Sequence, residues 1–98
     1  MSARTIVEAF RVPARHPSLP GHFPGDPVVP GVVLLDRVAA ALERAGAGRL
    51  ARVGTVKFVA PLRPGEDATL EAVCAGARVR FRVERAGAAV LVGDAELA

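Results

Sequence analysis

The chain contains no tryptophan, no tyrosine and only four phenylalanines. Proteins that bind single-stranded nucleic acid stack bases on aromatic side chains, and these phenylalanines show no alternation with basic residues. The thirteen lysine and arginine residues exceed the ten acids, but they are scattered along the chain and form no single basic stripe. We therefore expect no nucleic-acid partner, and the net charge of +3 leaves an acidic protein partner open.

Cysteine is equally scarce. A single cysteine, Cys74, excludes an internal disulfide, and no spacing of Cys and His is typical of a metal site. No apolar run is long enough to cross a bilayer, and the first residues lack the apolar core of a secretion signal. We therefore expect a cytoplasmic protein that holds no metal or cofactor and does not associate with a membrane.

The length allows one domain, residues 1–98, and 51% of these residues are hydrophobic. A domain of this size buries only about two-thirds of the surface of its unfolded chain, so its core is small. We expect a second copy to pack against it.

Proline and glycine are concentrated in one segment. Residues 20–31 hold four prolines and three glycines, which excludes a helix and argues against a central strand. We expect a shaped loop over residues 13–31. This loop carries His22, which lies between Gly21 and Phe23.

The apolar pattern predicts one helix and five strands. Residues 32–45 are apolar on nearly every side, and Gly46 and Gly48 supply a stop signal. Alternation of apolar and polar residues predicts strands over 4–12, 49–60, 67–75, 78–85 and 88–97. We expect an α+β fold with one long helix against an antiparallel sheet. Because a sheet covers only one side of a helix, two such units joined edge to edge would supply the remaining cover.

Two side chains near the helix start suit acid–base chemistry. The imidazole of His22 can accept a proton near neutral pH, and Asp36 lies in the second turn among apolar residues, which would raise its pKa and keep it protonated as a general acid. The alternatives are a hydrogen-bonded structural histidine and a solvent-facing acid that interacts with the helix dipole. Asp26 could replace Asp36, although turn chemistry accounts for it.

Gly31 completes this set. The N–H groups at a helix start have no partner within the helix, and they can receive a carbonyl oxygen that gains negative charge. Gly31 has no side chain to block that approach. A base, an acid and an oxyanion donor suit proton abstraction next to a carbonyl, together with protonation of a leaving hydroxyl.

Residues 21–32, Gly-His-Phe-Pro-Gly-Asp-Pro-Val-Val-Pro-Gly-Val, together with Leu35-Asp36, resemble the signature of bacterial 3-hydroxyacyl-[acyl-carrier-protein] dehydratases. A second similar segment contains Lys57-Phe58, Pro61 and Pro64-Gly65. The resemblance covers residues 15–98. It implies the hot-dog fold, in which an antiparallel sheet wraps around one central helix.

The resemblance also implies roles for individual residues. His22 would remove the C2 proton, Asp36 of the opposite subunit would protonate the leaving hydroxyl, and the Gly31 N–H would hold the thioester oxygen. Phe23 and Val32 would contact the substrate beside these groups. The reaction would convert (3R)-3-hydroxyacyl-acyl carrier protein, linked through phosphopantetheine, to the trans-2-enoyl thioester and water. The enzyme would be a homodimer, with a higher oligomer or a heterodimer as other assemblies, and it would need no cofactor.

Some features depart from the family pattern. An aspartate at position 36 is typical of the dehydratase/isomerase branch, whereas the complete His-Phe-Pro-Gly segment is typical of the dehydratase-only branch. Ala40 stands where family members commonly carry glutamine, and the short N-terminal segment resembles compact dehydratases of secondary pathways such as aryl polyene synthesis. Two other functions stay open: a hot-dog acyl-thioesterase, and a non-catalytic subunit that supplies half of a mixed site.

Overall fold

The structure is a computed structural model that describes residues 3–13 and 28–98. The elements in chain order are β1 (Arg4–Arg11), α1 (Gly31–Arg44), β2 (Leu50–Phe58), β3 (Asp67–Ala75), β4 (Arg78–Arg85) and β5 (Ala88–Leu97). The predicted helix and five strands are confirmed. The bounds of β3, β4 and β5 coincide with those expected from the alternation of apolar and polar residues.

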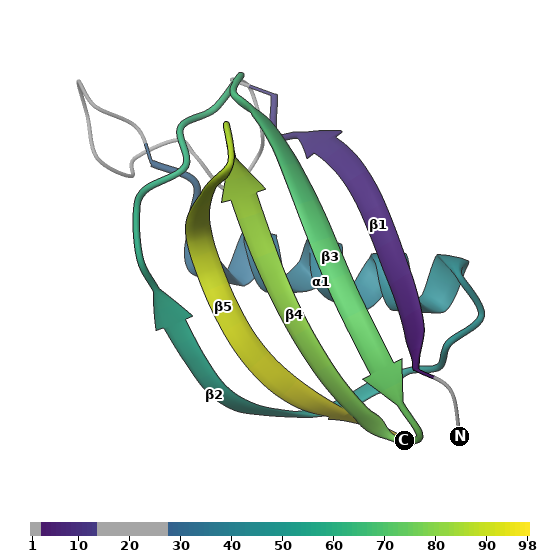
Figure 1. The fold of residues 1–98 in the computed structure, drawn as a ribbon. Helices are drawn as coiled ribbons and strands as arrows, with labels where there is room; N and C mark the ends of the chain where they lie inside the picture. Colours follow the sequence, from purple (N-terminus) through teal and green to yellow (C-terminus); the bar gives the residue numbers. More distant parts are fainter. Residues whose placement is uncertain (1–2, 14–27) are drawn as a thin grey trace.

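The five strands form one antiparallel sheet in the order β1-β3-β4-β5-β2. The helix crosses one face of this sheet (Figure 1). β2 follows the helix in the chain, yet it lies at the edge opposite β1. One long helix inserted into an antiparallel sheet confirms the predicted α+β class and the hot-dog fold.

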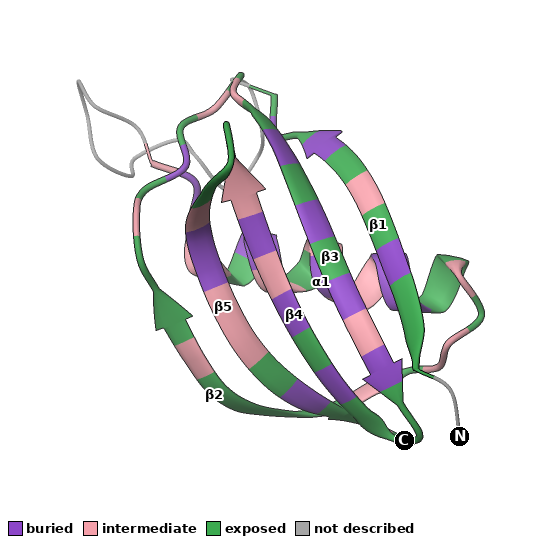
Figure 2. Cartoon of the chain, in the orientation of Figure 1, coloured by how far each residue is buried: buried purple, intermediate pink, exposed green. Residues whose placement is uncertain are grey.

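The core lies between the helix and the sheet. Buried positions alternate along β3 and β4 (Figure 2), because successive side chains of a strand point to opposite faces. The helix contributes five buried residues, which are Val33, Leu34, Val38, Ala41 and Leu42. Each large apolar side chain buried in this way stabilises the fold by about 1.5–3 kcal/mol relative to its exposed state.

The C-terminal end of α1 is tied to the edge strand β1. The Arg4 guanidinium donates a hydrogen bond to the Ala45 carbonyl, and Arg44 forms an ion pair with Glu8. Gly46 follows with a φ of 71°, in agreement with the predicted stop signal. The helix therefore has a defined end as well as a defined face.

The opposite face of α1 is open. Val32 is 62% exposed, and Asp36 and Glu43 are also exposed. The sheet of one chain therefore covers one side of the helix only, as expected from the apolar composition of residues 32–45. Within the described ranges, no helix is long and apolar enough to cross a membrane.

Strand β2 is the exposed edge of the sheet. Val53 and Phe58, expected from the sequence to be part of the apolar content of this strand, are 37% and 56% exposed. In the single chain β2 pairs with β5 alone. The alternation of apolar and polar residues indicates that a strand has an apolar face, but it does not indicate what covers that face.

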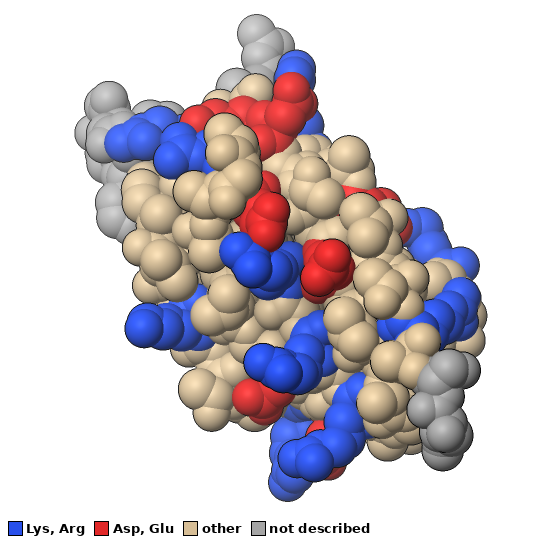
Figure 3. Space-filling model, viewed as in Figure 1, with Lys and Arg blue, Asp and Glu red and all other residues tan. Residues whose placement is uncertain are grey.

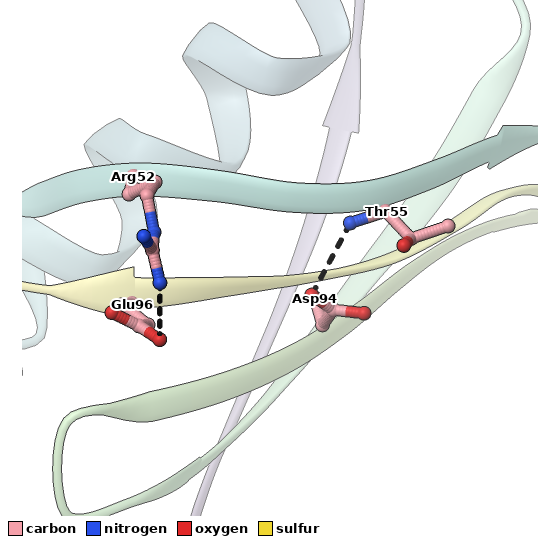
Figure 4. A network of polar contacts seen from close by, with 4 residues as sticks. All are labelled: Arg52, Thr55, Asp94 and Glu96. Carbon is pink, nitrogen blue, oxygen red and sulfur yellow. Dashed lines mark hydrogen bonds and ion pairs between the residues drawn. The ribbon is translucent and has the colours of Figure 1, made fainter.

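A β-bulge interrupts β2 between Val53 and Val56. The Asp94 carboxylate on β5 accepts a hydrogen bond from the Thr55 N–H at 3.3 Å, and Arg52 pairs with Glu96 at 2.9 Å (Figure 4). A Cβ at Gly54 would lie 2.0 Å from the Asp94 carboxylate oxygen. The Asp94 carboxylate therefore lies at the bulge where a side chain of Gly54 would otherwise be.

Candidate active site at the start of the helix

The residues singled out from the sequence divide into two groups. His22 and Phe23 fall in residues 14–27, outside the described residues, and so does the alternative acid Asp26. Gly31, Val32 and Asp36 are described and all belong to α1. The site is therefore built here from the helix start and from the described chain on either side of residues 14–27.

The described chain on both sides of residues 14–27 is held by one turn. The Val12 carbonyl accepts a hydrogen bond from the Gly65 N–H at 2.8 Å, and the Val29 N–H donates to the Leu62 carbonyl at 2.8 Å. Val12, Val29 and Leu62 are buried. Residues 62–65 thus hold the chain by hydrogen bonds at Val12, before residues 14–27, and at Val29, after them.

An ion pair supports this turn. The Glu66 carboxylate accepts a hydrogen bond from the Arg63 N–H at 2.7 Å and pairs with Arg85 of β4 at 2.7 Å. The Arg85 hydrogen bond, followed by the Arg63 N–H, lowers the pKa of Glu66 below its ordinary value. The sequence singled out Pro61 and Pro64-Gly65 of this turn through the family resemblance, but it gave no signal for Glu66, whose partner lies on another strand.

The helix starts without a side-chain cap in the described part of the chain. Pro30 occupies the N-cap position in an extended conformation, and the first turn contains no acid. The Val33 N–H donates to the Pro30 carbonyl at 3.0 Å. The N–H groups of Gly31 and Val32 precede it at the positively polarised end of the helix.

A pocket of about 380 Å³ opens beside this helix start. Its walls are residues 28–31, Leu34 and residues 58–62, and they are mainly apolar. The ring of Phe58 lies against Gly31, where a Cβ would be 2.5 Å from the ring Cζ atom. The pocket therefore brings together the proposed oxyanion donor and an aromatic ring of β2.

Asp36 does not line this pocket. At about 100° per residue, five residues of helix turn its side chain about 140° away from that of residue 31. It lies one turn after Val32, on the exposed face of α1. The apolar surroundings expected for Asp36 are therefore absent from the described part of a single chain.

The described residues contain no group of His, Cys, Asp and Glu side chains suited to hold a metal ion. Among the described residues, the helix start offers two backbone N–H groups, an apolar pocket and one carboxylate on a separate face.

Comparison with known proteins identifies relatives. A family model described as ApeI-like, for the ApeI dehydratase, matches residues 1–94. The 3-hydroxyacyl-[acyl-carrier-protein] dehydratase FabZ of Chlamydia trachomatis is 32% identical over 83 residues, which are 74% of this chain and 54% of the relative. FabZ of Sodalis glossinidius is 35% identical over 92 residues, 83% of this chain and 56% of the relative. The chain thus spans about half the length of these curated relatives.

Solved structures share the fold. The dehydratase heterocomplex ApeI:P from Xenorhabdus doucetiae superimposes with a TM-score of 0.85 at 21% identity, covering 100% of this chain and 95% of that chain. The fluoroacetyl-CoA thioesterase FlK superimposes with a TM-score of 0.72 at 22% identity, covering 100% and 86%. Because dehydratases and a thioesterase share this architecture, the fold alone does not select a reaction.

Proposed function

The chain belongs to the ApeI-like dehydratase family, and on that premise we propose that it removes water from a (3R)-3-hydroxyacyl thioester of acyl carrier protein. The product is the trans-2-enoyl thioester. The FabZ relatives, named for this reaction, support the choice of substrate class.

In this proposal His22 takes the proton from C2, and the electrons left behind move toward the thioester carbonyl. The Gly31 N–H, at the uncapped helix start, stabilises the negative charge on the carbonyl oxygen. Asp36 then gives a proton to the C3 hydroxyl, which leaves as water. Phe23 and Val32 contact the acyl thioester beside these groups. No metal or cofactor takes part.

The position of Asp36 carries the proposal. It is exposed on a helix face turned away from the pocket beside Gly31, so one chain does not supply its own pocket with this acid. A second chain whose helix packs against the open face would bring its Asp36 to the pocket of the first. The same contact would surround the carboxyl with apolar groups.

The proposed assembly is a homodimer joined at β2. This edge pairs with β5 on one side only and presents exposed apolar side chains, Val53, Phe58 and Val59. An unpaired strand of this kind is a template for pairing with another chain. Pairing of two β2 edges would extend the sheet and bring the two open helix faces together.

The proposed protein partner is the acyl carrier protein, an acidic protein that the excess of arginine would attract. On the outer face of the sheet, however, positive and negative groups are interspersed (Figure 3). We therefore do not place the carrier on that face.

The test is a product assay with 3-hydroxyacyl carrier protein. Wild type is expected to release water and form the enoyl thioester, and His22→Ala is expected to lose this activity. Dehydration that survives the substitution would refute the assignment of the base. Mass spectrometry also distinguishes dehydration from the reaction of a thioesterase, because thioester hydrolysis leaves free acid and free carrier thiol.

A subunit of a mixed hot-dog dimer is the second candidate. The observations in its favour are Ala40, which replaces the glutamine common in the family, and the structural similarity to the ApeI:P heterocomplex. This candidate requires that the purified chain be inactive alone and that a second hot-dog chain restore turnover. Activity of the purified chain alone excludes it.

A further inference from the structure

Phe58 is a large apolar residue in an unusual position. It is the last residue of β2, and its register partner on β5 is Leu91, which is fully buried beneath the helix. The Phe58 side chain belongs to the same helix-facing side of the sheet, yet it is 56% exposed. No further described strand flanks the ring, because β2 is an edge of the sheet.

The ring and Gly31 fit against each other. An ideal Cβ at Gly31 would lie 2.5 Å from Cζ and 2.6 Å from Cε1 of Phe58. Carbon atoms in contact are ordinarily about 3.5–4.0 Å apart, so any side chain at residue 31 would displace the ring. The absence of a side chain at Gly31 thus has a second reason, which is to seat Phe58.

The same ring forms one wall of the apolar pocket at the helix start. Residues 28–30 and the segment 59–62 form the other walls, with Leu34. A thioester whose oxygen is bound at the Gly31 N–H would lie beside this ring. The size of the ring therefore limits the width of the pocket at Gly31.

We propose that Phe58 is a specificity-determining residue that selects which acyl groups enter the pocket at the start of α1. The inference rests on the proposed function for the class of ligand, an acyl thioester of pantetheine. A smaller side chain at residue 58 leaves the Gly31 N–H in place and widens the pocket beside it. Long acyl groups gain affinity from the apolar surface that they then bury, and short ones gain little.

The experiment measures binding without chemistry. Acyl-pantetheine amides with four and ten carbons, in which nitrogen replaces the thioester sulfur, are titrated into wild type, Phe58→Leu and Phe58→Ala and followed by NMR. Val53→Ala is the matched control, because Val53 is an exposed apolar residue of the same edge strand that does not line the pocket. Dehydration of the corresponding 3-hydroxyacyl carrier proteins is measured in parallel.

The ratio of affinities for the long and the short amide is expected to rise about tenfold in Phe58→Ala, by less in Phe58→Leu, and to stay at the wild-type value in Val53→Ala. An unchanged ratio in both Phe58 variants would overturn the inference, as would a wild type that binds neither amide. If Phe58→Ala loses its dimer while dimeric Phe58→Leu keeps the wild-type ratio, Phe58 acts only in the interface and the inference is wrong. A shifted ratio without dehydration would support Phe58 and refute the proposed function.

Discussion

At the scale of single residues, Gly31 and Gly54 each leave a space where a Cβ would lie, and a side chain from another element occupies that space. Gly31 was singled out from the sequence as a helix-start donor without a side chain. Its contact with Phe58 was not predictable, because the two residues meet only when β2 packs beside the helix. Gly54, whose Cβ space holds the Asp94 carboxylate, gave no signal in the sequence.

Gly31→Ala is expected to move the Phe58 ring and to lower dehydration activity at least tenfold, since the new methyl displaces the pocket wall. If the collision is the cause, Gly31→Ala/Phe58→Ala recovers activity relative to Gly31→Ala alone. Steady-state rates of the two single variants and the double variant form the cycle. Strictly additive losses would show that residue 31 and Phe58 act independently.

Gly54→Ala is expected to destabilise the fold by about 1–3 kcal/mol, because its methyl meets the Asp94 carboxylate at the bulge. The cost should be smaller in an Asp94→Ala background, where that space is empty. Urea unfolding of the four proteins measures both values. Equal costs of Gly54→Ala in the two backgrounds would contradict the close approach.

At the scale of elements, the sequence predicted the helix and the strands found in the described residues, because alternation and a continuous apolar run are strong signals. It did not predict which strands lie at the edges, since the pairing order depends on contacts between distant segments. It also did not predict that one turn, residues 62–65, holds the chain on both sides of residues 14–27. The placement of His22 and Phe23 stays a prediction.

The Glu66–Arg85 pair is expected to stabilise this turn in a pH-dependent way. Because the folded state lowers the pKa of Glu66, the stabilisation is complete above its ordinary value near 4.5 and is lost as the pH falls through the lower folded pKa. Glu66→Gln should therefore lower the urea midpoint more at pH 7 than at pH 3. Glu71→Gln, on the exposed face of β3, is the control that should show no such difference. A Glu66→Gln effect of equal size at both pH values would contradict the assignment.

At the scale of the whole molecule, the chain has one covered and one open helix face, together with an unpaired edge at β2. Length and composition predict that a second chain packs against this one, because a helix apolar on most sides needs cover on both, and that assembly stays a prediction. They were not sufficient to locate the contact. The proposed contact is placed from the exposed residues of β2 and of α1.

Val32→Asp is expected to weaken the dimer at least tenfold, since it buries a charge on the open helix face. Its effect on the fold of the single chain should be small, because Val32 is 62% exposed there. Val7→Asp is the matched control: Val7 is 61% exposed on β1, at the opposite edge of the sheet. Sedimentation equilibrium compares the two variants. Equal dimer dissociation constants for the two variants would show that the interface lies elsewhere.

The central claim is that His22 and Asp36 of one site belong to different chains. His22→Ala and Asp36→Asn are each expected to be inactive as purified homodimers. When equal amounts are unfolded together and refolded, about half of the dimers are mixed, and one of the two sites in each mixed dimer has both native residues. The account predicts recovery of about one quarter of wild-type dehydration activity per chain. Two inactive variants that stay inactive after mixing, although mixed dimers form, would contradict it.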